Sequence, residues 1–168
     1  MANRGKPEDP EQLAKSIALR LLARREHSRV ELATKLRQRR VDSRVIDPVL
    51  DEFEAEGWLS DERFADVYAR QRFELGYGPL RIRSELQQRG IRFTPACIND
   101  VSEHRWRQQA IAVRRRRFGL TDLRDDWKEK GRQARFLSQR GFSGEQVEQA
   151  LEVTGPEGDE AGLTDCPH

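Results

Sequence analysis

The chain has 168 residues, which is the length of one ordinary domain or of a short array of repeats. Hydrophobic residues make up only 36% of it and charged residues another 36%, which argues against one large, deep core and favours thin layers that bury one another. The net charge of +2 is unevenly placed. Residues 152–168 hold five acids and no Lys or Arg, so residues 1–151 carry 31 basic against 24 acidic residues, a net charge of +7.

Arginine supplies 26 of the 31 basic residues. Its guanidinium makes bidentate contacts with phosphate or carboxylate better than lysine does, although a GC-rich coding bias would favour arginine as well. Cys97 and Cys166 lie far apart and there is no CxxC pair, so the sequence predicts neither a disulfide framework nor a cysteine metal site. The N-terminus has no apolar stretch and no run approaches about 18 apolar residues, so we expect a cytoplasmic protein without a membrane span.

Helix signals recur along the chain, while strand signals are nearly absent. Asp9 followed by Pro10 predicts an N-cap and the first position of a helix, which the apolar spacing continues to about Arg25. A further helix is expected over residues 43–56, before Gly57. Pro48 lies inside this helix and should kink it or move its start later.

The stretch RREHSRVEL, residues 24–32, permits two interpretations. A histidine beside a serine, with carboxylates nearby, could be a small hydrolytic site. Ser28 and Glu31 also match a capping box, with His27 and Leu32 as the hydrophobic staple beside it. A nucleophilic serine needs a base within hydrogen-bond reach and a third group that orients the base, which adjacent residues at a helix start do not easily provide. We therefore favour the cap, followed by a helix to about Arg39.

A second block repeats this plan about 50 residues further on. A helix is expected from Ser60 to about Leu75, and the stretch GYGPLRIRSELQQRGI then aligns with the second helix of the first block. Thr94-Pro95 predicts the third helix of this block. A third, fainter block predicts helices near 107–118 and 125–139 and a last short helix after Ser143. The residues expected to begin or end helices as caps are Ser28, Glu31, Gly78, Pro79, Gly90 and Gly141.

The sequence thus predicts an all-α fold of three tandem three-helix repeats, similar to helix-turn-helix modules, that form an elongated, curved array. The expected divisions are a flexible N-terminus (1–10), repeat 1 (11–59), repeat 2 (60–104), repeat 3 (105–151) and a disordered acidic tail (152–168).

Residues that could carry catalysis form no recognisable pattern. The sequence contains no P-loop, no glycine fingerprint for dinucleotides and no HExxH motif, and its three histidines are scattered. Nearly every Asp and Glu falls on a predicted polar helix face, where a solvated charge is the ordinary interpretation. We expect no enzyme activity, no metal and no cofactor.

The densest charge lies in HRWRQQAIAVRRRRF, residues 104–118, which holds six arginines and no acid. Four consecutive arginines surround a helix, so some must face outward and could bind phosphate, with Trp106 available for stacking. The alternative is a solvated face neutralised by the acids of residues 122–126. The first two blocks carry further basic faces. The residues expected to bind a partner or DNA are Arg25, Lys35, Arg39, Arg72, Arg81, Arg89, Arg114, Arg115, Arg116 and Arg117.

Four stretches together resemble the RecX regulatory proteins: LLARREHSRVELATKLRQR, LSDERFADVYARQR, GYGPLRIRSELQQRGI and RFLSQRGFS. The resemblance covers about residues 14–151. One departure is Arg40, where the other two blocks have glycine. The resemblance implies a helical-repeat protein that binds the RecA recombinase, in the groove of the RecA–DNA filament or at its growing end. It also implies inhibition of the ATPase, strand-exchange and coprotease activities of RecA, and no catalytic residue.

The first hypothesis is therefore a monomeric RecX-type negative regulator of RecA in DNA repair and the SOS response, whose basic faces contact RecA or its DNA. The second is a stand-alone DNA-binding helical module that competes with RecA for DNA, which predicts salt-sensitive DNA binding without RecA. The third is a nuclease, which requires a metal-binding acid cluster that the sequence does not show.

Overall fold

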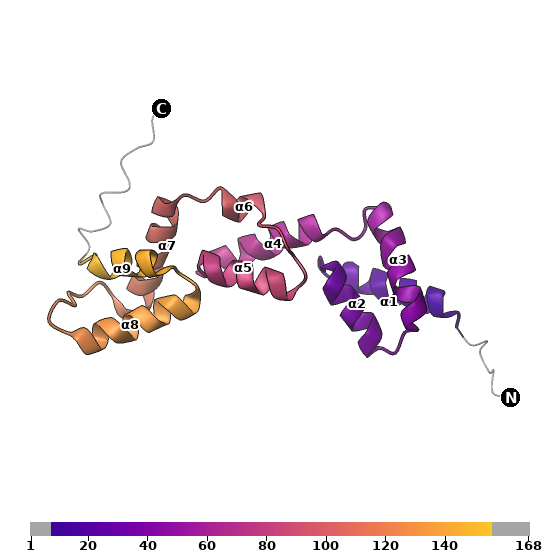
Figure 1. Cartoon of the computed structure of the whole chain (residues 1–168), viewed down its shortest axis with the longest axis horizontal. Coiled ribbons are helices and arrows are strands. Elements are labelled where there is room, and N and C mark those ends of the chain that lie inside the picture. Colours follow the sequence, from indigo (N-terminus) through magenta and orange to yellow (C-terminus); the bar gives the residue numbers. More distant parts are fainter. Residues whose placement is uncertain (1–7, 156–168) are drawn as a thin grey trace, which may run out of the picture. The chain divides into compact units, whose positions relative to one another are not determined.

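A computed structural model describes residues 8–155, and all regular structure in that range is helical, which confirms the all-α fold (Figure 1). The helices are α1 (Pro10–Leu22), α2 (Arg29–Gln38), α3 (Ser43–Ala55), α4 (Asp61–Glu74), α5 (Pro79–Gln88), α6 (Ala96–Asn99), α7 (Glu103–Phe118), α8 (Trp127–Arg140) and α9 (Gly144–Glu152). Contacts divide the chain into unit 1 (Met1–Tyr68 and Leu86–Pro95) and unit 2 (Ala69–Glu85 and Ala96–His168), so α4 and α5 belong partly to each.

The core of unit 1 lies between α1, α2 and α3, which pack on one another (Figure 1). Apolar side chains fall on one face of each helix because residues three and four positions apart lie side by side. Burying a side chain as large as Phe53 or Leu50 contributes about 1.5–3 kcal/mol. The buried residues are Ala14, Ile17, Ala18, Leu21, Leu32, Ala33, Leu36, Val41, Ile46, Val49, Leu50, Phe53 and Leu59.

Helix α1 begins as predicted. The side chain of Asp9 accepts a hydrogen bond from the backbone N–H two residues further on at 3.4 Å, and Pro10 takes the first helical position. The helix ends at Leu22, three residues before the predicted end. Its final turn tightens, because Arg24 donates its backbone N–H to the carbonyl oxygen of Leu21 at 3.1 Å, the shorter spacing of a 3₁₀ turn.

Helix α3 contains Pro48 in its interior, yet it starts at Ser43, where the first helical residue was predicted. The cap at Asp42 explains this start. Its carboxylate accepts the backbone N–H of Arg44 at 3.0 Å, which satisfies one of the donors that a helix start leaves without a partner. The proline therefore did not move the start of the helix.

In unit 2, α7, α8 and α9 pack together around a second core (Figure 1). Helix α7 begins at Glu103, four residues earlier than predicted, because the Ser102 hydroxyl accepts the backbone N–H of Arg105 at 3.1 Å. Helix α9 begins with a complete capping box between Ser143 and Gln146. The buried apolar residues of this core are Trp106, Ala110, Ile111, Val113, Leu123, Leu137, Phe142, Val147, Ala150, Leu151 and Val153.

The helix predicted after Thr94-Pro95 is short. It is α6, which spans only Ala96–Asn99. Only three residues separate its end from Ser102, which caps the long helix α7, so the chain leaves no room for a further turn.

Order extends beyond Leu151, where the sequence placed the last ordered residue. Glu152 ends α9, Val153 is buried, and the backbone N–H of Gly155 donates to the carbonyl oxygen of Leu120 at 2.8 Å. The remainder of the predicted tail, 156–168, and most of the predicted flexible N-terminus, 1–7, lie outside the described residues.

The turn after α8 meets the start of α5 at backbone distance. Gly78 donates its backbone N–H to the carbonyl oxygen of Arg140 at 2.8 Å, and Leu80 donates to that of Gly141 at 3.0 Å. Gly141 has φ +100°, and a Cβ there would lie 2.3 Å from the Cβ of Arg81. A side chain fits neither the backbone angle nor the space, so this turn requires glycine.

The equivalent turns of unit 1 show the same requirement once. Gly90 follows α5 with φ +79°, and a Cβ there would lie 2.2 Å from a methyl group of Val30. Arg40 follows α2 at the corresponding position and keeps the left-handed conformation with φ 59°. Arg40 is exposed, so its side chain has the room that Gly90 lacks, and the turn forms without glycine.

Candidate partner-binding surfaces

The stretch around Ser28 is a helix start. Glu31 donates its backbone N–H to the Ser28 hydroxyl at 3.1 Å, and the Glu31 carboxylate accepts the backbone N–H of Ser28 at 3.3 Å. His27 is buried, with Nδ1 3.0 Å from the carbonyl oxygen of Arg25, and burial lowers the pKa of its imidazole. The serine hydroxyl is thus used to cap α2, as the capping box predicted.

We expect Ser28→Ala to lower the free energy of unfolding by about 1 kcal/mol, because one N–H of the first turn loses its acceptor. Urea unfolding followed by circular dichroism measures this, with Ser84→Ala, at an exposed position within α5, as the control. The variant should keep its regulatory activity. A Ser28→Ala protein of unchanged stability that loses all activity would point to a functional serine instead.

In unit 1, a carboxylate holds two of the predicted partner-binding arginines. Glu31 lies 3.1 Å from Arg25 Nη1 and 3.4 Å from Arg89 Nε. The Arg89 guanidinium also lies 4.6 Å from the centre of the Tyr68 ring. These two arginines therefore fasten the start of α2 to the turn after α5, and a partner would bind them only in part.

A hollow of about 260 Å³ opens beside this ion pair. Lys35 lies on its wall, and Arg39 follows at the end of α2, fully exposed. No ion pair joins Arg39 to another of the residues that the structure describes. An acidic group of a partner could therefore bind here without displacing an internal carboxylate. The hollow is lined by Val30, Glu31, Thr34, Lys35, Gln38, Gln88 and Arg89.

In unit 2, three arginines surround the ring of Tyr77. The guanidinium carbons of Arg72, Arg81 and Arg140 lie 3.9, 4.5 and 4.3 Å from its centre. Glu85 accepts two hydrogen bonds of 2.7 Å from Arg72 and one of 2.9 Å from Arg81. Three positive charges thus share one carboxylate and one aromatic face.

The same arrangement continues over two further rings. Phe118 and Phe136 lie edge to face, 5.2 Å apart. Arg117 lies about equally far from both, at 5.9 and 6.0 Å, while Arg132 covers Phe118 at 5.1 Å and Arg140 covers Phe136 at 5.8 Å. We call this series the arginine–aromatic ladder. Its members are Arg72, Arg81, Arg117, Arg132 and Arg140 with Tyr77, Phe118 and Phe136.

The ladder is strongly basic. Its five arginines pair with two carboxylates, Glu85 and Glu129, which leaves a net charge of +3. A guanidinium stacked on a ring keeps its N–H groups at the edge, where they can donate to phosphate or carboxylate oxygens. The geometry suits an extended anionic partner.

One of the predicted partner-binding residues is placed differently. Arg114 is fully buried, and its guanidinium donates to Gln133 Oε1 and to the carbonyl oxygens of Thr121, Ala150 and Val153 at 2.6–3.0 Å. It caps the carbonyls at the end of α9, which have no partner within the helix. The expectation that Arg114 contacts a partner is therefore wrong in this structure, because its face of α7 points into the core.

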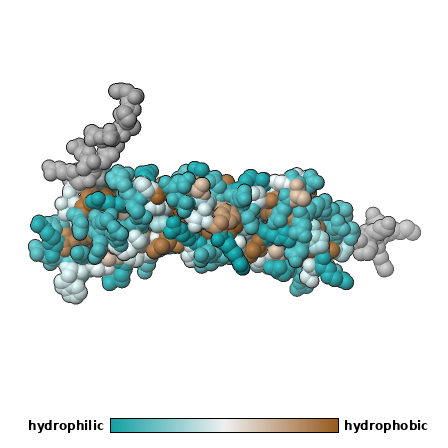
Figure 2. All heavy atoms as spheres, turned by 45° about the horizontal axis from the view of Figure 1, so that its top comes forward, coloured by the Kyte–Doolittle hydropathy of each residue, from teal (hydrophilic) through white to brown (hydrophobic). Residues whose placement is uncertain are grey.

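The other arginines of the run, residues 115–117, are exposed at the end of α7. Trp106, expected to stack on bases, is buried against Phe73 with ring centres 5.2 Å apart, so it is unavailable for stacking. The aromatic rings near the exposed arginines are instead those of Phe118 and Phe136. Figure 2 shows that hydrophilic residues cover most of the visible face and that hydrophobic residues form small, separate patches.

The ladder was largely missed from the sequence. Tyr77, Phe118, Phe136, Arg132 and Arg140 were not among the predicted partner-binding residues. A signal was present for one of them: Arg140-Gly141 repeats the pattern of Arg89-Gly90, and Arg89 was predicted.

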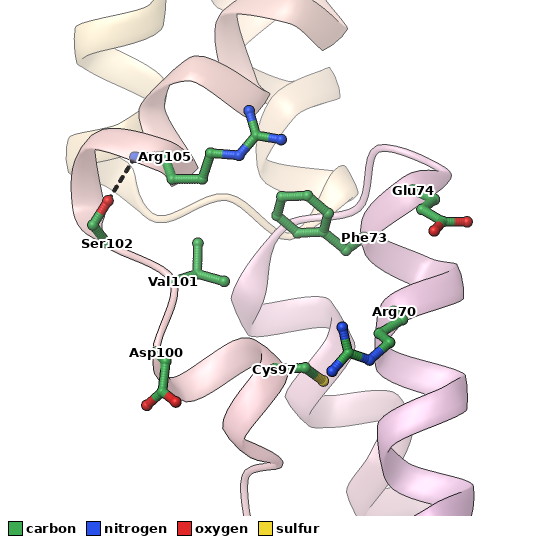
Figure 3. Close-up of a pocket in the computed structure, with 8 residues that line it drawn as sticks. All are labelled: Arg70, Phe73, Glu74, Cys97, Asp100, Val101, Ser102 and Arg105. Atoms are coloured by element: carbon green, nitrogen blue, oxygen red, sulfur yellow. Dashed lines mark hydrogen bonds between the residues drawn. The ribbon is translucent and has the colours of Figure 1, made fainter. Parts of the chain in front are cut away.

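A hollow of about 440 Å³ in unit 2 lies between α4, α6 and α7 (Figure 3). Arg105 lies over the Phe73 ring at 5.5 Å on one wall. Arginines and acids line it in equal number, and its one thiol, Cys97, has no histidine in the lining to act as a base. The hollow therefore offers neither a strong charge nor a catalytic pair. Its lining is Arg70, Phe73, Glu74, Cys97, Asp100, Val101, Ser102 and Arg105.

Within residues 8–155, no group of three or more His, Cys, Asp or Glu side chains is arranged to hold a metal ion. Among the same residues, no helix is long and apolar enough to cross a membrane.

Three-helix units with basic surfaces define the class of helical-repeat proteins. Models of the RecX family match the chain in order: the first three-helix domain over residues 14–53, the second over 60–92 and the third over 107–151. The chain therefore belongs to the RecX family of regulatory proteins, as the resemblance predicted.

Relatives named Regulatory protein RecX align over most of their length. The one from Halorhodospira halophila (strain DSM 244 / SL1) is 46% identical over 154 residues, which cover 90% of this chain and 93% of that protein. The one from Acidithiobacillus ferrooxidans (strain ATCC 53993 / BNL-5-31) is 43% identical over 136 residues, covering 81% and 87%.

Two solved structures share the fold. A crystal structure of regulatory protein RecX superposes with a TM-score of 0.68 at 20% identity and covers 84% of this chain and 73% of that one. RecX from Lactobacillus salivarius superposes with a TM-score of 0.67 at 18% identity and covers 85% and 95%. At these identities the likeness concerns the fold alone.

Proposed function

We propose that this chain is a cytoplasmic, monomeric regulator that binds the RecA recombinase and its DNA filament and inhibits the ATPase, strand-exchange and coprotease activities of RecA. It would thereby modulate DNA repair and the SOS response. The observation that carries the proposal is the ordered match to all three RecX domains, together with relatives named Regulatory protein RecX that align over most of their length.

The basic surfaces supply a physical mechanism. Several modest contacts on one chain, each made to a different part of a filament, add up to tight binding because the later contacts form within one molecule. In unit 1 the exposed contact would be Lys35 and Arg39, and in unit 2 it would be the arginines at the end of α7. Arg25, Arg72, Arg81 and Arg89 would take part with the outer edges of their guanidinium groups, since carboxylates hold part of each.

Charge reversal at both surfaces tests the electrostatic part. We expect Lys35→Glu, Arg39→Glu, Arg116→Glu and Arg117→Glu together to raise the concentration for half-maximal inhibition of RecA by at least about tenfold, since attraction becomes repulsion at both contacts. The helical circular dichroism should be unchanged.

The matched control reverses four other exposed arginines, Arg20, Arg24, Arg92 and Arg135, and so makes the same change in net charge. It should inhibit nearly as well as the wild-type chain. Equal loss in both variants, or full inhibition by the first, would contradict the assignment of these surfaces.

A second candidate function is DNA binding without RecA, and the arginine–aromatic ladder is the observation that favours it. Stacked guanidinium groups beside exposed ring edges are typical of surfaces that follow a single-stranded phosphate backbone. This function predicts binding to single-stranded DNA that weakens steeply as salt rises, because each neutralised phosphate releases a counterion. DNA affinity that is absent or insensitive to salt would remove it.

A further inference from the structure

The chain carries an acidic segment directly after its last described residue. Residues 156–168 contain Glu157, Asp159, Glu160 and Asp165 and no Lys or Arg. The segment starts from a fixed point, because the Gly155 N–H donates to the Leu120 carbonyl oxygen at 2.8 Å.

That starting point lies beside one end of the arginine–aromatic ladder. Leu120 is only two residues beyond Phe118, the ring covered by Arg132 at 5.1 Å and Arg117 at 5.9 Å. Arg132 is 60% exposed and pairs with Glu129, while the contacts of exposed Arg117 within the described residues are with the two phenylalanine rings. The Arg117 charge is therefore oriented by the rings and balanced by no described carboxylate.

Geometry favours an encounter between the two. Glu157 is two residues beyond Gly155 and so lies within about 7 Å of it, and the 13 residues can span at most about 45 Å. A segment tethered this closely reaches its binding surface at an effective concentration of about millimolar, so even a weak ionic contact is well populated. The charges are complementary, four acids against the basic end of the ladder.

We propose that residues 156–168 bind the end of the ladder formed by Arg117, Phe118 and Arg132 and compete there with an anionic partner. The segment would set the affinity of unit 2 for RecA or DNA, so the inference deepens the proposed function by adding regulation. It rests on that function only for the identity of the displaced partner.

The experiment compares full-length chains. One variant neutralises the segment with Glu157→Gln, Asp159→Asn, Glu160→Gln and Asp165→Asn. The control neutralises four exposed acids elsewhere, Glu8, Glu56, Glu62 and Glu148, as Gln, and so makes the same change in net charge. Fluorescence anisotropy measures affinity for single-stranded oligo(dT) at low and high salt.

We expect the segment variant to bind oligo(dT) about fivefold more tightly than the control variant at 50 mM NaCl, and the two to differ little at 400 mM, where charges are screened. The advantage should vanish when Arg117→Gln and Arg132→Gln are present in both chains. Equal affinities of the segment and control variants at low salt would overturn the proposal.

A second measurement needs no partner. The Nε–H resonances of Arg117 and Arg132 should shift between the wild-type chain and the segment variant and stay unchanged in the control variant. Unchanged resonances in all three proteins would overturn the proposal, whether or not the chain inhibits RecA. Shifted resonances in a chain without effect on RecA would retain this proposal and reject the proposed function.

Discussion

Replacing Gly141 by alanine is expected to destabilise the protein by about 3 kcal/mol or more. Two effects combine: the residue must keep φ +100°, and its new Cβ would lie 2.3 Å from the Cβ and 2.6 Å from the backbone nitrogen of Arg81. The left-handed conformation costs about 1–2 kcal/mol and overpacking adds about 1–3 kcal/mol. Because the neighbour is backbone at the start of α5, it cannot turn aside as a flexible side chain would.

Gly57→Ala is the matched control. Gly57 also has a positive φ, +76°, but nothing lies within 4 Å of the position its Cβ would take, so only the conformational cost of about 1–2 kcal/mol applies. Urea unfolding followed by circular dichroism measures both variants. Equal destabilisation would show that the close approach of the turn to α5 does not matter.

The second large effect is expected at Arg114. Arg114→Met should cost about 3 kcal/mol or more, because the buried carbonyl oxygens of Thr121, Ala150 and Val153 lose their donor and each unsatisfied buried group costs about 1–3 kcal/mol. Burial lowers the pKa of the Arg114 guanidinium, yet an arginine remains charged at neutral pH, and the four hydrogen-bond acceptors offset the cost of burying that charge.

Arg116→Met, two residues further along the same helix, is the control for Arg114. Arg116 is exposed, so the change should stay within about 0.5 kcal/mol. Thermal and urea unfolding of both variants give the comparison. A stability of Arg114→Met within 1 kcal/mol of the wild-type chain would mean that water replaces the guanidinium and that the carbonyl cap is dispensable.

The elements that sequence alone could predict are those set by local chemistry. The caps at Asp9, Ser28 and Ser143 depend on residues within one turn of the helix start, so the order of the helices followed directly. The end of α1 and the length of α6 were less predictable, because they depend on tightening of a turn and on the position of the next cap.

The surfaces were less predictable because they depend on which helix face packs inward. Residues 114–117 follow one another at about 100° intervals around α7, so the run covers every side, and only tertiary packing shows that Arg114 faces the core. The ladder joins residues up to 68 positions apart, from Arg72 to Arg140, and no local pattern brings them together.

The most direct test of the proposed function is the rate of ATP hydrolysis by RecA on single-stranded DNA, titrated with this chain from well below equimolar. The account predicts inhibition, and inhibition at substoichiometric ratios would favour a block at the filament end over binding along its groove. An unchanged rate at equimolar chain, with the RecA shown to be active, would contradict the account.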